Sequence, residues 1–256
     1  MTGLPRAFLD TPIAHRAFHD RAAGRPENSM EAVRAALAVG YGIEIDIQPS
    51  SDGAAMVFHD YDLKRLTGGT GPICQRSRAE LHDFPLLGGH CAIPTLDEVL
   101  DEVAGRVPVL IEIKDQDGAM GREVGALERA VARAVAGYDG PVAVMSFNPH
   151  SVAALAEAAP DIPRGITTCA YARPNWSGLP GPVRELLRGI PDYHRVGACF
   201  ISHRWSDLAR SRVAELRDQG AAILCWTIRS PRDEAIARAI AQNVTFEGYA
   251  ASHPAA

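Results

Sequence analysis

Carboxylates alternate with isoleucines in the segment Ile43-Glu44-Ile45-Asp46-Ile47-Gln48. Strict alternation is the period-two pattern of a β-strand, so we expect Glu44 and Asp46 on one face and the isoleucines on the other. Two carboxylates this close repel each other, and burying them is costly unless a positive charge lies between them. The segment is therefore either a strand with one solvent-exposed face or one wall of a cation site.

A second segment, Val109-Leu110-Ile111-Glu112-Ile113-Lys114, repeats this pattern and places Glu112 and Lys114 on a common face. The two segments together supply three carboxylates and no thiolate. Hard oxygen ligands of this kind suit Mg²⁺ or Ca²⁺, with waters or substrate oxygens filling the remaining positions. The alternative is that Glu44, Asp46 and Glu112 simply pair with Arg16 or Lys114 and bind no metal.

Two histidines follow short apolar segments. His15 comes after Pro12-Ile13-Ala14, and His59 comes after Met56-Val57-Phe58. Imidazole exchanges protons near neutral pH, so His15 and His59 are candidates for a general acid and a general base. We expect Asp60 to orient its loop or to hydrogen-bond nearby backbone. Five other histidines are interpreted as structural or solvated: His19, His82, His90, His150 and His194.

Arg16 and Lys114 place cations beside these groups. Together with a divalent metal they would suit a phosphate monoester or diester, although they would balance the carboxylates equally well without any ligand. Trp226 and Phe147, near the ends of later predicted strands, either form the apolar wall of a pocket or serve only in packing.

Strand and helix signals alternate along most of the chain. Further strands are predicted at 142–145, near Ile166, and at 198–201, 222–226 and 244–246. Helix starts are predicted from capping residues, and these are Asn28 or Ser29 with Glu31, Thr95 with Glu98, Asn148 with Pro149, Ser206, and Ser230 with Pro231. The helices after residues 122, 206 and 230 are expected to reach residues 135, 216 and 240. A further helix is expected at about 183–187.

About eight strands and seven or eight helices in alternation predict a parallel sheet with helical crossovers. Eight such units in 256 residues match an α/β protein with a (β/α)8 TIM barrel, whose active site lies at the C-terminal ends of the strands. A doubly wound open sheet is the second choice, but no G-x-G-x-x-G follows the first strand. We expect one domain over residues 1–256, with an insertion after the second strand at about 49–94, where loop signals are dense.

Composition narrows the class of protein. A net charge of −5 argues against nucleic acid or an anionic membrane surface as a partner. No apolar run is long enough for a signal peptide or for the roughly 20 residues of a membrane span, so no stable membrane insertion is expected. The five cysteines are scattered without a C-x-x-C pair, which favours a reducing compartment and a cytoplasmic protein. The sequence leaves the oligomeric state open.

Taken together, these residues resemble the glycerophosphodiester phosphodiesterase family. The resemblance runs in order from about residue 12 to residue 230. It is carried by His15-Arg16, Pro26-Glu27-Asn28-Ser29, Glu44-Ile45-Asp46, His59-Asp60, Pro94-Thr95-Leu96, Glu112-Ile113-Lys114, Ser146-Phe147-Asn148-Pro149 and Trp226-Thr227.

The resemblance implies a barrel enzyme that hydrolyses a small-molecule glycerophosphodiester to glycerol 3-phosphate and an alcohol, with Mg²⁺ or Ca²⁺ as cofactor. In that family a glycerol hydroxyl is thought to attack phosphorus, giving a cyclic phosphate that water then opens. The matching positions are Glu44, Asp46 and Glu112 as metal ligands, His15 and His59 as the acid–base pair, and Arg16 and Lys114 as phosphate-holding residues. Trp226 is a further candidate for substrate binding.

Two segments depart from the family pattern. Ala17 stands where glycine usually follows His-Arg, and Asn243-Val244-Thr245-Phe246-Glu247-Gly248-Tyr249 replaces the usual Asp-Gly-Ile and Thr-Asp. We expect neither departure to touch the metal ligands or the histidines, but both to affect the substrate and the pocket shape.

Three other functions fit parts of the pattern. One is a related phospholipase-D-like enzyme that acts on lysolipid or sphingolipid head groups. Another is a non-catalytic phosphate-ligand binding protein on the same barrel. The last is a barrel glycosidase, whose paired carboxyls would lie about 5–10 Å apart without a metal. That option leaves His15, His59 and Lys114 unexplained.

Overall fold

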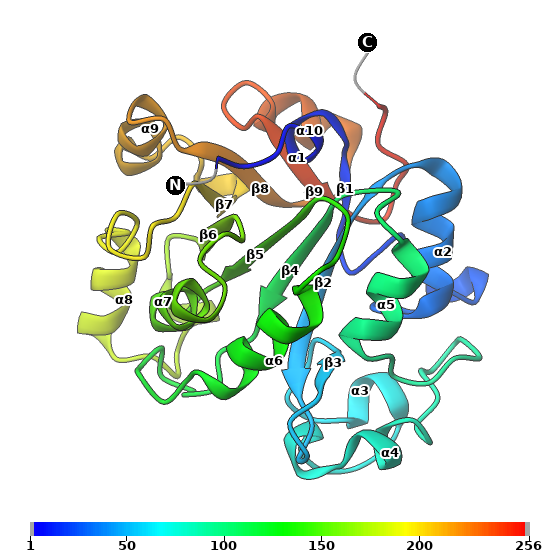
Figure 1. Ribbon diagram of the computed structural model, residues 1–256. Helices are drawn as coiled ribbons and strands as arrows, with labels where there is room; N and C mark the ends of the chain where they lie inside the picture. Colours follow the sequence, from blue (N-terminus) through cyan, green and yellow to red (C-terminus); the bar gives the residue numbers. More distant parts are fainter. Residues whose placement is uncertain (1–2, 254–256) are drawn as a thin grey trace.

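The computed structural model describes residues 3–253, and within them eight parallel strands form a closed barrel (Figure 1). The strands are β1 (Ile13–Ala14), β2 (Gly42–Pro49), β4 (Val109–Ile113), β5 (Val142–Ser146), β6 (Arg164–Thr168), β7 (Phe200–Arg204), β8 (Ala222–Ile228) and β9 (Asn243–Phe246). The short strand β1 pairs with β2 on one side and with β9 on the other, which closes the sheet. The (β/α)8 barrel is therefore confirmed, and the open doubly wound sheet is excluded.

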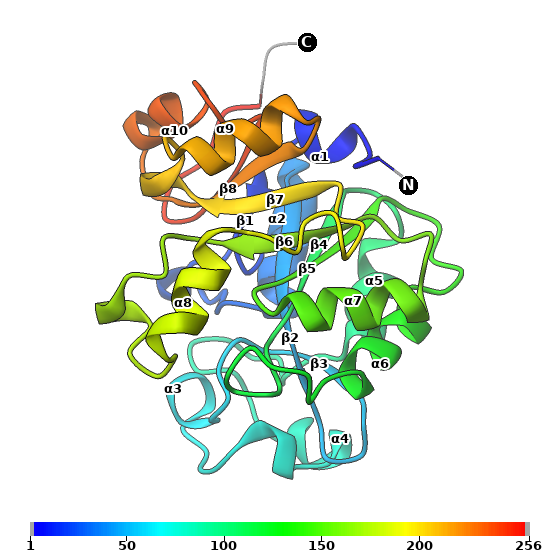
Figure 2. The same ribbon diagram turned by 90° about the vertical axis from the view of Figure 1, so that its left-hand side faces the viewer.

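Helices follow the strands in turn and cover the outside of the barrel (Figures 1 and 2). They are α2 (Met30–Val39), α5 (Leu96–Val103), α6 (Ala126–Val135), α7 (Pro149–Ala158), α8 (Gly181–Arg188), α9 (Ser211–Asp218) and α10 (Pro231–Ala237), with the short α1 (Ala7–Asp10) before β1. No helix within residues 3–253 has the length and apolar character needed to cross a membrane.

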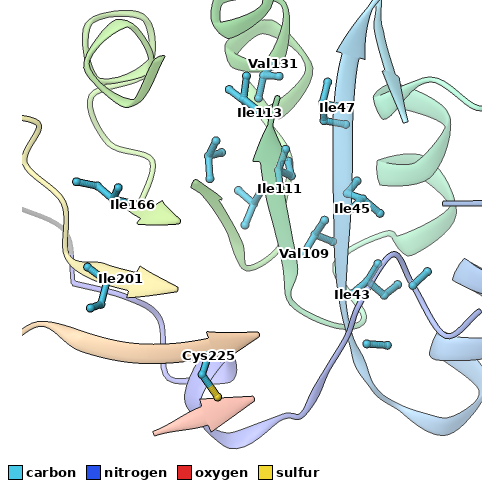
Figure 3. Packing of buried hydrophobic residues seen from close by; sticks show 14 of the residues in the cluster. Ile43, Ile45, Ile47, Val109, Ile111, Ile113, Val131, Ile166, Ile201 and Cys225 are labelled. Atoms are coloured by element: carbon cyan, nitrogen blue, oxygen red, sulfur yellow. The ribbon is translucent and has the colours of Figure 1, made fainter. Parts of the chain in front are cut away.

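The isoleucines of β2 lie in the layer between strands and helices. Ile43, Ile45 and Ile47 are fully buried and share one apolar cluster with the matching side chains of β4 (Figure 3). The opposite face of these strands points into the barrel. There, Leu110 belongs to a second buried cluster with Phe200 and Leu224. Because Glu112 lies two residues beyond Leu110 on the same face, the interior changes from apolar to charged toward the C-terminal ends of the strands.

Most predicted helix starts are confirmed. Ser29 caps α2 by accepting from the Ala32 backbone N–H, and Thr95 forms a capping box with Glu98 at the start of α5. Asn148 and Ser230 cap α7 and α10, each followed by proline in the first turn.

Glu31 and Ser206 do not have their predicted capping roles. The Glu31 carboxylate accepts the backbone N–H groups of His90 at 2.7 Å and Cys91 at 2.9 Å, so it fastens α2 to a distant loop. Burial acts to raise the pKa of Glu31, but these hydrogen bonds lower it to about 2. Ser206 lies in a 3₁₀ turn because β7 extends past the predicted end at 201 to Arg204, which delays the start of α9 to Ser211.

Two predicted helix boundaries are also wrong. The helix expected from about 122 begins at Ala126, because the Asp117 carboxylate accepts the backbone N–H groups of Gly121 and Glu123 in a turn that competes with the helix. The helix expected to reach 240 ends at Ala237, where the Arg238 backbone N–H closes the last turn.

Residues 49–94 contain β3 (Ala55–Val57), α3 (Lys64–Thr67), the 3₁₀ turn η2 (Ile73–Gln75) and α4 (Arg78–Leu81), drawn in cyan tones at one end of the molecule (Figures 1 and 2). They pack around an apolar cluster of their own that includes Phe58, Leu63 and Leu81. The strand β3 runs antiparallel to the end of β2, and the Phe58 N–H donates to the Asp46 carbonyl at 2.8 Å. This pairing sets His59 beside the end of β2. The interpretation of 49–94 as an insertion into one domain stays a prediction.

Replacing Ile45 with alanine tests how far the strand depends on its buried face. We expect Ile45→Ala to lower the free energy of unfolding by about 2–5 kcal/mol, since the side chain is fully buried and its removal leaves a cavity. Urea denaturation measures this loss. Val39→Ala, at a position that is 48% exposed, should change stability by about 0.5 kcal/mol at most. Equal effects of the two substitutions would contradict the packing described.

Candidate active site

One cavity of about 160 Å³ at the C-terminal ends of the strands brings together all eight predicted site residues. They are His15, Arg16, Glu44, Asp46, His59, Glu112, Lys114 and Trp226. Thr245 and Arg229 also line it, as does Phe147. Residues from the first and the last barrel strands therefore meet at one place.

Strand register explains the meeting of the carboxylates. The parallel pairing of β2 with β4 sets Asp46 directly beside Glu112, and Glu44 lies two residues earlier on the same face of β2. One carboxylate oxygen from each of these three residues lies within 4.8 Å of the other two. The exposed fractions are only 1% for Glu44, 2% for Asp46 and 6% for Glu112. We refer to these three residues as the carboxylate cluster.

Lys114 lies between two members of the carboxylate cluster. Its Nζ is 2.7 Å from Glu112 Oε1 and 3.1 Å from Asp46 Oδ1. Burial alone would lower the pKa of Lys114, but the two carboxylates raise it overall. Burial would likewise raise the pKa of Asp46, yet Lys114 and other nearby cations lower it. Both groups are therefore charged at neutral pH.

The negative charge of Glu44 is compensated by fewer nearby cations than that of Asp46. Its Oε2 accepts the Arg16 backbone N–H at 2.8 Å, and His15 Nε2 lies 4.0 Å away. Burial and then the charges of Asp46 and Glu112 raise the pKa of Glu44 well above its ordinary value. The cluster thus has room, in charge and in oxygen donors, for a further cation.

Asn28 positions the carboxylate of Asp46. Its side chain is fully buried, its Nδ2 donates to Asp46 Oδ2 at 3.0 Å, and its Oδ1 accepts the Asp46 backbone N–H at 3.3 Å. Of the two candidates for the α2 cap, Ser29 takes that role and Asn28 does not. Asn28 has a φ of 58°, a left-handed conformation that asparagine tolerates better than most residues.

The loop after β1 has a left-handed backbone conformation at two non-glycine residues. Arg16 and Ala17 have φ values of 51° and 64°, in the left-handed region that favours glycine. The Ala17 N–H donates to the carbonyl of Glu44 at 2.9 Å. The backbone of residue 17 therefore lies next to that of Glu44 through a hydrogen bond that glycine would also make, and the expectation that alanine at this position leaves the metal ligands untouched stays a prediction.

The C-terminal segment that departs from the family pattern, residues 243–249, contacts a histidine. His15 Nδ1 lies 2.5 Å from Glu247 Oε2, and the same carboxylate is held by Arg229, whose Nε and Nη2 are 2.8 and 2.6 Å from Oε1. His19 Nε2 is 3.5 Å from Glu247, so His19 is part of the site's surroundings rather than a solvated residue elsewhere. The expectation that this segment leaves the histidines alone is therefore wrong.

His59 is held in the same manner as His15. Its Nδ1 is 2.7 Å from Asp60 Oδ1, and Arg65 Nε is 2.6 Å from Asp60 Oδ2. Asp60 thus binds the imidazole ring next to it rather than nearby backbone. Each histidine has its Nδ1 against a carboxylate that an arginine anchors, which favours the tautomer with an unprotonated Nε2.

Arg65 connects Arg16 to the carboxylate that holds His59. Its Nη1 and Nη2 donate to both carboxylate oxygens of Glu27 at 2.8 Å, and Glu27 accepts from Arg16 Nη1 at 2.6 Å. Burial opposes the charge on Glu27, but the two arginines lower its pKa. A continuous chain of ion pairs therefore runs from Arg16 to His59.

The sequence carried a weak signal for Glu247 and none for Arg65. Glu247 directly follows the last predicted strand, which is the place where barrel residues face the active site. Arg65 lies within the segment 49–94, whose conformation the sequence did not predict.

A comparison with protein families finds a match to the glycerophosphoryl diester phosphodiesterase family over residues 15–246. The chain is 28% identical to YhdW of Bacillus subtilis (strain 168) over 233 residues, which are 87% of this chain and 88% of YhdW. It is 30% identical to a glycerophosphodiester phosphodiesterase of Caldanaerobacter subterraneus over 172 residues, covering 63% of this chain and 68% of that enzyme. A solved structure of a phosphodiesterase of Oleispira antarctica, in complex with the product sn-glycerol-3-phosphate, superposes with a TM-score of 0.74. That likeness covers 94% of each chain at 24% identity.

Neutralising Glu247 tests the contact with His15. Burial lowers the pKa of His15, and the hydrogen bond from Glu247 partly offsets that effect. We therefore expect Glu247→Gln to lower the pKa of His15 further, because the amide no longer stabilises the charged imidazole. Titration of the His15 ring by NMR measures the shift. Glu215→Gln, on the surface of α9, is the matched control and should leave the pKa of His15 unchanged. An unchanged pKa in Glu247→Gln would contradict the contact.

Proposed function

The chain belongs to the glycerophosphoryl diester phosphodiesterase family and is a phosphodiesterase, and we propose that it cleaves glycerophosphodiesters with a bound divalent cation and two catalytic histidines. The products are glycerol 3-phosphate and an alcohol. The observation that carries the proposal is the approach of three buried carboxylates within 4.8 Å, beside two histidines that are each held at Nδ1.

Glu44, Asp46 and Glu112 are the proposed ligands of the cation. The set fits Mg²⁺ or Ca²⁺ because its donors are oxygens, and because a divalent charge would relieve the repulsion that raises the pKa of Glu44. When bound, such a cation polarises the phosphoryl oxygens and makes a nearby hydroxyl more acidic.

Arg16 and Lys114 are proposed to hold the phosphate. Both line the cavity next to the carboxylate cluster and keep their positive charge, since nearby carboxylates raise the pKa of each in spite of burial. A guanidinium and an ammonium on one side of the cavity would also orient the diester, so that the leaving oxygen faces a histidine.

We propose that His15 Nε2 removes the proton from the neighbouring glycerol hydroxyl. Burial lowers the pKa of His15, which favours the neutral ring that can accept a proton. The hydroxyl oxygen forms a bond to phosphorus while the bond from phosphorus to the alcohol oxygen breaks. His59, which has to enter this step with both ring nitrogens protonated, gives its Nε2 proton to that oxygen while its Nδ1 stays against Asp60.

The resulting cyclic phosphate is then opened by water with the two histidines in reversed roles. His59 takes a proton from the water as its oxygen bonds to phosphorus, and His15 returns a proton to the glycerol oxygen as the ring bond breaks. Both histidines end in their starting states, and glycerol 3-phosphate is released.

Metal removal tests the role of the carboxylate cluster. We expect EDTA to abolish hydrolysis of glycerophosphodiesters and added Mg²⁺ or Ca²⁺ to restore it. Calorimetry should show one divalent ion bound per chain in the wild type and none in Glu44→Gln, with the surface variant Glu215→Gln as control. Full activity after exhaustive chelation would refute the proposed cofactor.

Removal of either imidazole tests the acid–base assignment. His15→Ala and His59→Ala should each reduce turnover by about 10²–10⁴-fold while the thermal unfolding curve stays cooperative. The control His194→Ala, at an exposed position, should keep wild-type turnover. A variant at position 15 or 59 with wild-type turnover would show that the residue has no part in proton transfer.

A further inference from the structure

A second and larger cavity, of about 560 Å³, opens from the proposed active site. The two cavities share His59, Glu112, Lys114, Phe147 and Trp226 in their walls. Glycerol and phosphate are far smaller than the drug-sized ligands that cavities of this volume hold. We call this second cavity the apolar groove.

Aromatic side chains build the walls of the apolar groove. The Phe147 ring lies 5.1 Å from that of Trp176 and 5.5 Å from that of Trp226, and Met120 packs in the same cluster. The ring of Tyr171, which is buried, packs against that of Trp176 with 5.0 Å between the ring centroids. Met120 follows β4, Phe147 follows β5, and Tyr171 and Trp176 follow β6, while Trp226 lies within β8. Together they form a cluster apart from the main core.

The polar tips of two aromatic residues are already bonded within the protein. Trp226 Nε1 donates to the Ser202 carbonyl at 3.0 Å, and the Tyr61 hydroxyl donates to the Asp115 carbonyl at 2.7 Å. What these two residues can offer to a ligand is therefore ring surface rather than a hydrogen bond.

Four carboxylates line the groove, and of these Glu112 is paired with Lys114, while Asp62 is exposed and accepts the Lys64 N–H at 2.9 Å. Asp60 is held by His59 and Arg65, and Asp115 accepts Asn148 Nδ2 at 2.8 Å and the Met120 N–H at 3.1 Å. A polyol would lose hydrogen bonds to water on entering and find few replacements. A cationic group at the inner end would meet the ammonium of Lys114.

We propose that the apolar groove binds the alcohol portion of the substrate, and that the alcohol it selects is uncharged and apolar. The inference rests on the proposed function and adds a substrate class to it. His59 lines both cavities, so an alcohol in the groove has its ester oxygen next to the residue proposed to protonate it. Specificity for the alcohol then comes from Trp176 and Met120, which line only the groove.

Three glycerophosphodiesters that differ only in the alcohol test the proposal. They carry 3,3-dimethylbutanol, choline or glycerol, and the first two have nearly the same shape but differ in charge. We expect kcat/KM for the dimethylbutyl diester to exceed that for the glycerol diester by roughly tenfold or more, on the scale that a hydrophobic pocket provides. The choline diester should not exceed the dimethylbutyl diester. A faster choline diester would mean that the groove selects a cation, and equal values for all three would mean that it does not contact the alcohol.

Variants test whether the preference for the dimethylbutyl diester arises in the apolar groove. Trp176→Ala should lower kcat/KM for the dimethylbutyl diester by about tenfold and that for the glycerol diester by a much smaller factor. Trp176→Phe, which keeps an apolar ring, should retain most of the preference. The control Leu186→Ala, at a 59% exposed position on α8, should behave as the wild type. An equal loss on both diesters would point to a structural role for Trp176 and overturn the assignment.

Failure of the proposed function would be visible separately, because no diester would then be hydrolysed. In that case calorimetric binding of the same diesters tests the groove. Tighter binding of the dimethylbutyl diester by the wild type than by Trp176→Ala would support the groove, and equal binding would refute it.

Discussion

Three carboxylates buried side by side at the mouth of a barrel are the constraint around which the surrounding structure is arranged. Carboxylates in such a place must be hydrogen-bonded or matched by positive charge, since burial otherwise drives them to the neutral acid. Asp46 is matched by Lys114 and Asn28, and Glu112 is matched by Lys114. Glu44 is the member left with the least compensation, which makes it the most sensitive indicator of whether a cation is bound.

Each of the two histidines has its Nδ1 against a carboxylate, but the two carboxylates come from different parts of the chain. Asp60 is the sequence neighbour of His59, whereas Glu247 is brought to His15 from the far end of the barrel. In both cases an arginine fixes the carboxylate, and the imidazole is restricted at Nδ1. The ion pairs through Glu27 then couple the position of His59 to the loop that carries His15. The segment 49–94 is thus tied to the barrel by charge as well as by the pairing of β3 with β2.

The fold was predictable because each element carries its own local pattern. The alternation in β2 marks both a strand and its two faces, and the caps at Thr95, Asn148 and Ser230 mark helix starts. The meeting of Glu44, Asp46 and Glu112 also follows from local patterns, once neighbouring strands of a parallel barrel are assumed. The features that the sequence did not predict depend on contacts between distant segments. Asn28 lost the capping role because Asp46 binds its side chain, and Glu31 lost its role because a distant loop offers two N–H groups.

The closure of the barrel through β1 has a consequence for the newly made chain. The strand β1 lies between β2 and β9, and the partner of His15 is 232 residues further along the sequence. On the ribosome, all three carboxylates and both histidines are made long before the strand that completes their surroundings. An unfinished chain would therefore carry His15 without the carboxylate that fixes its ring. The surroundings of His15 would be complete only after β9 joins the barrel.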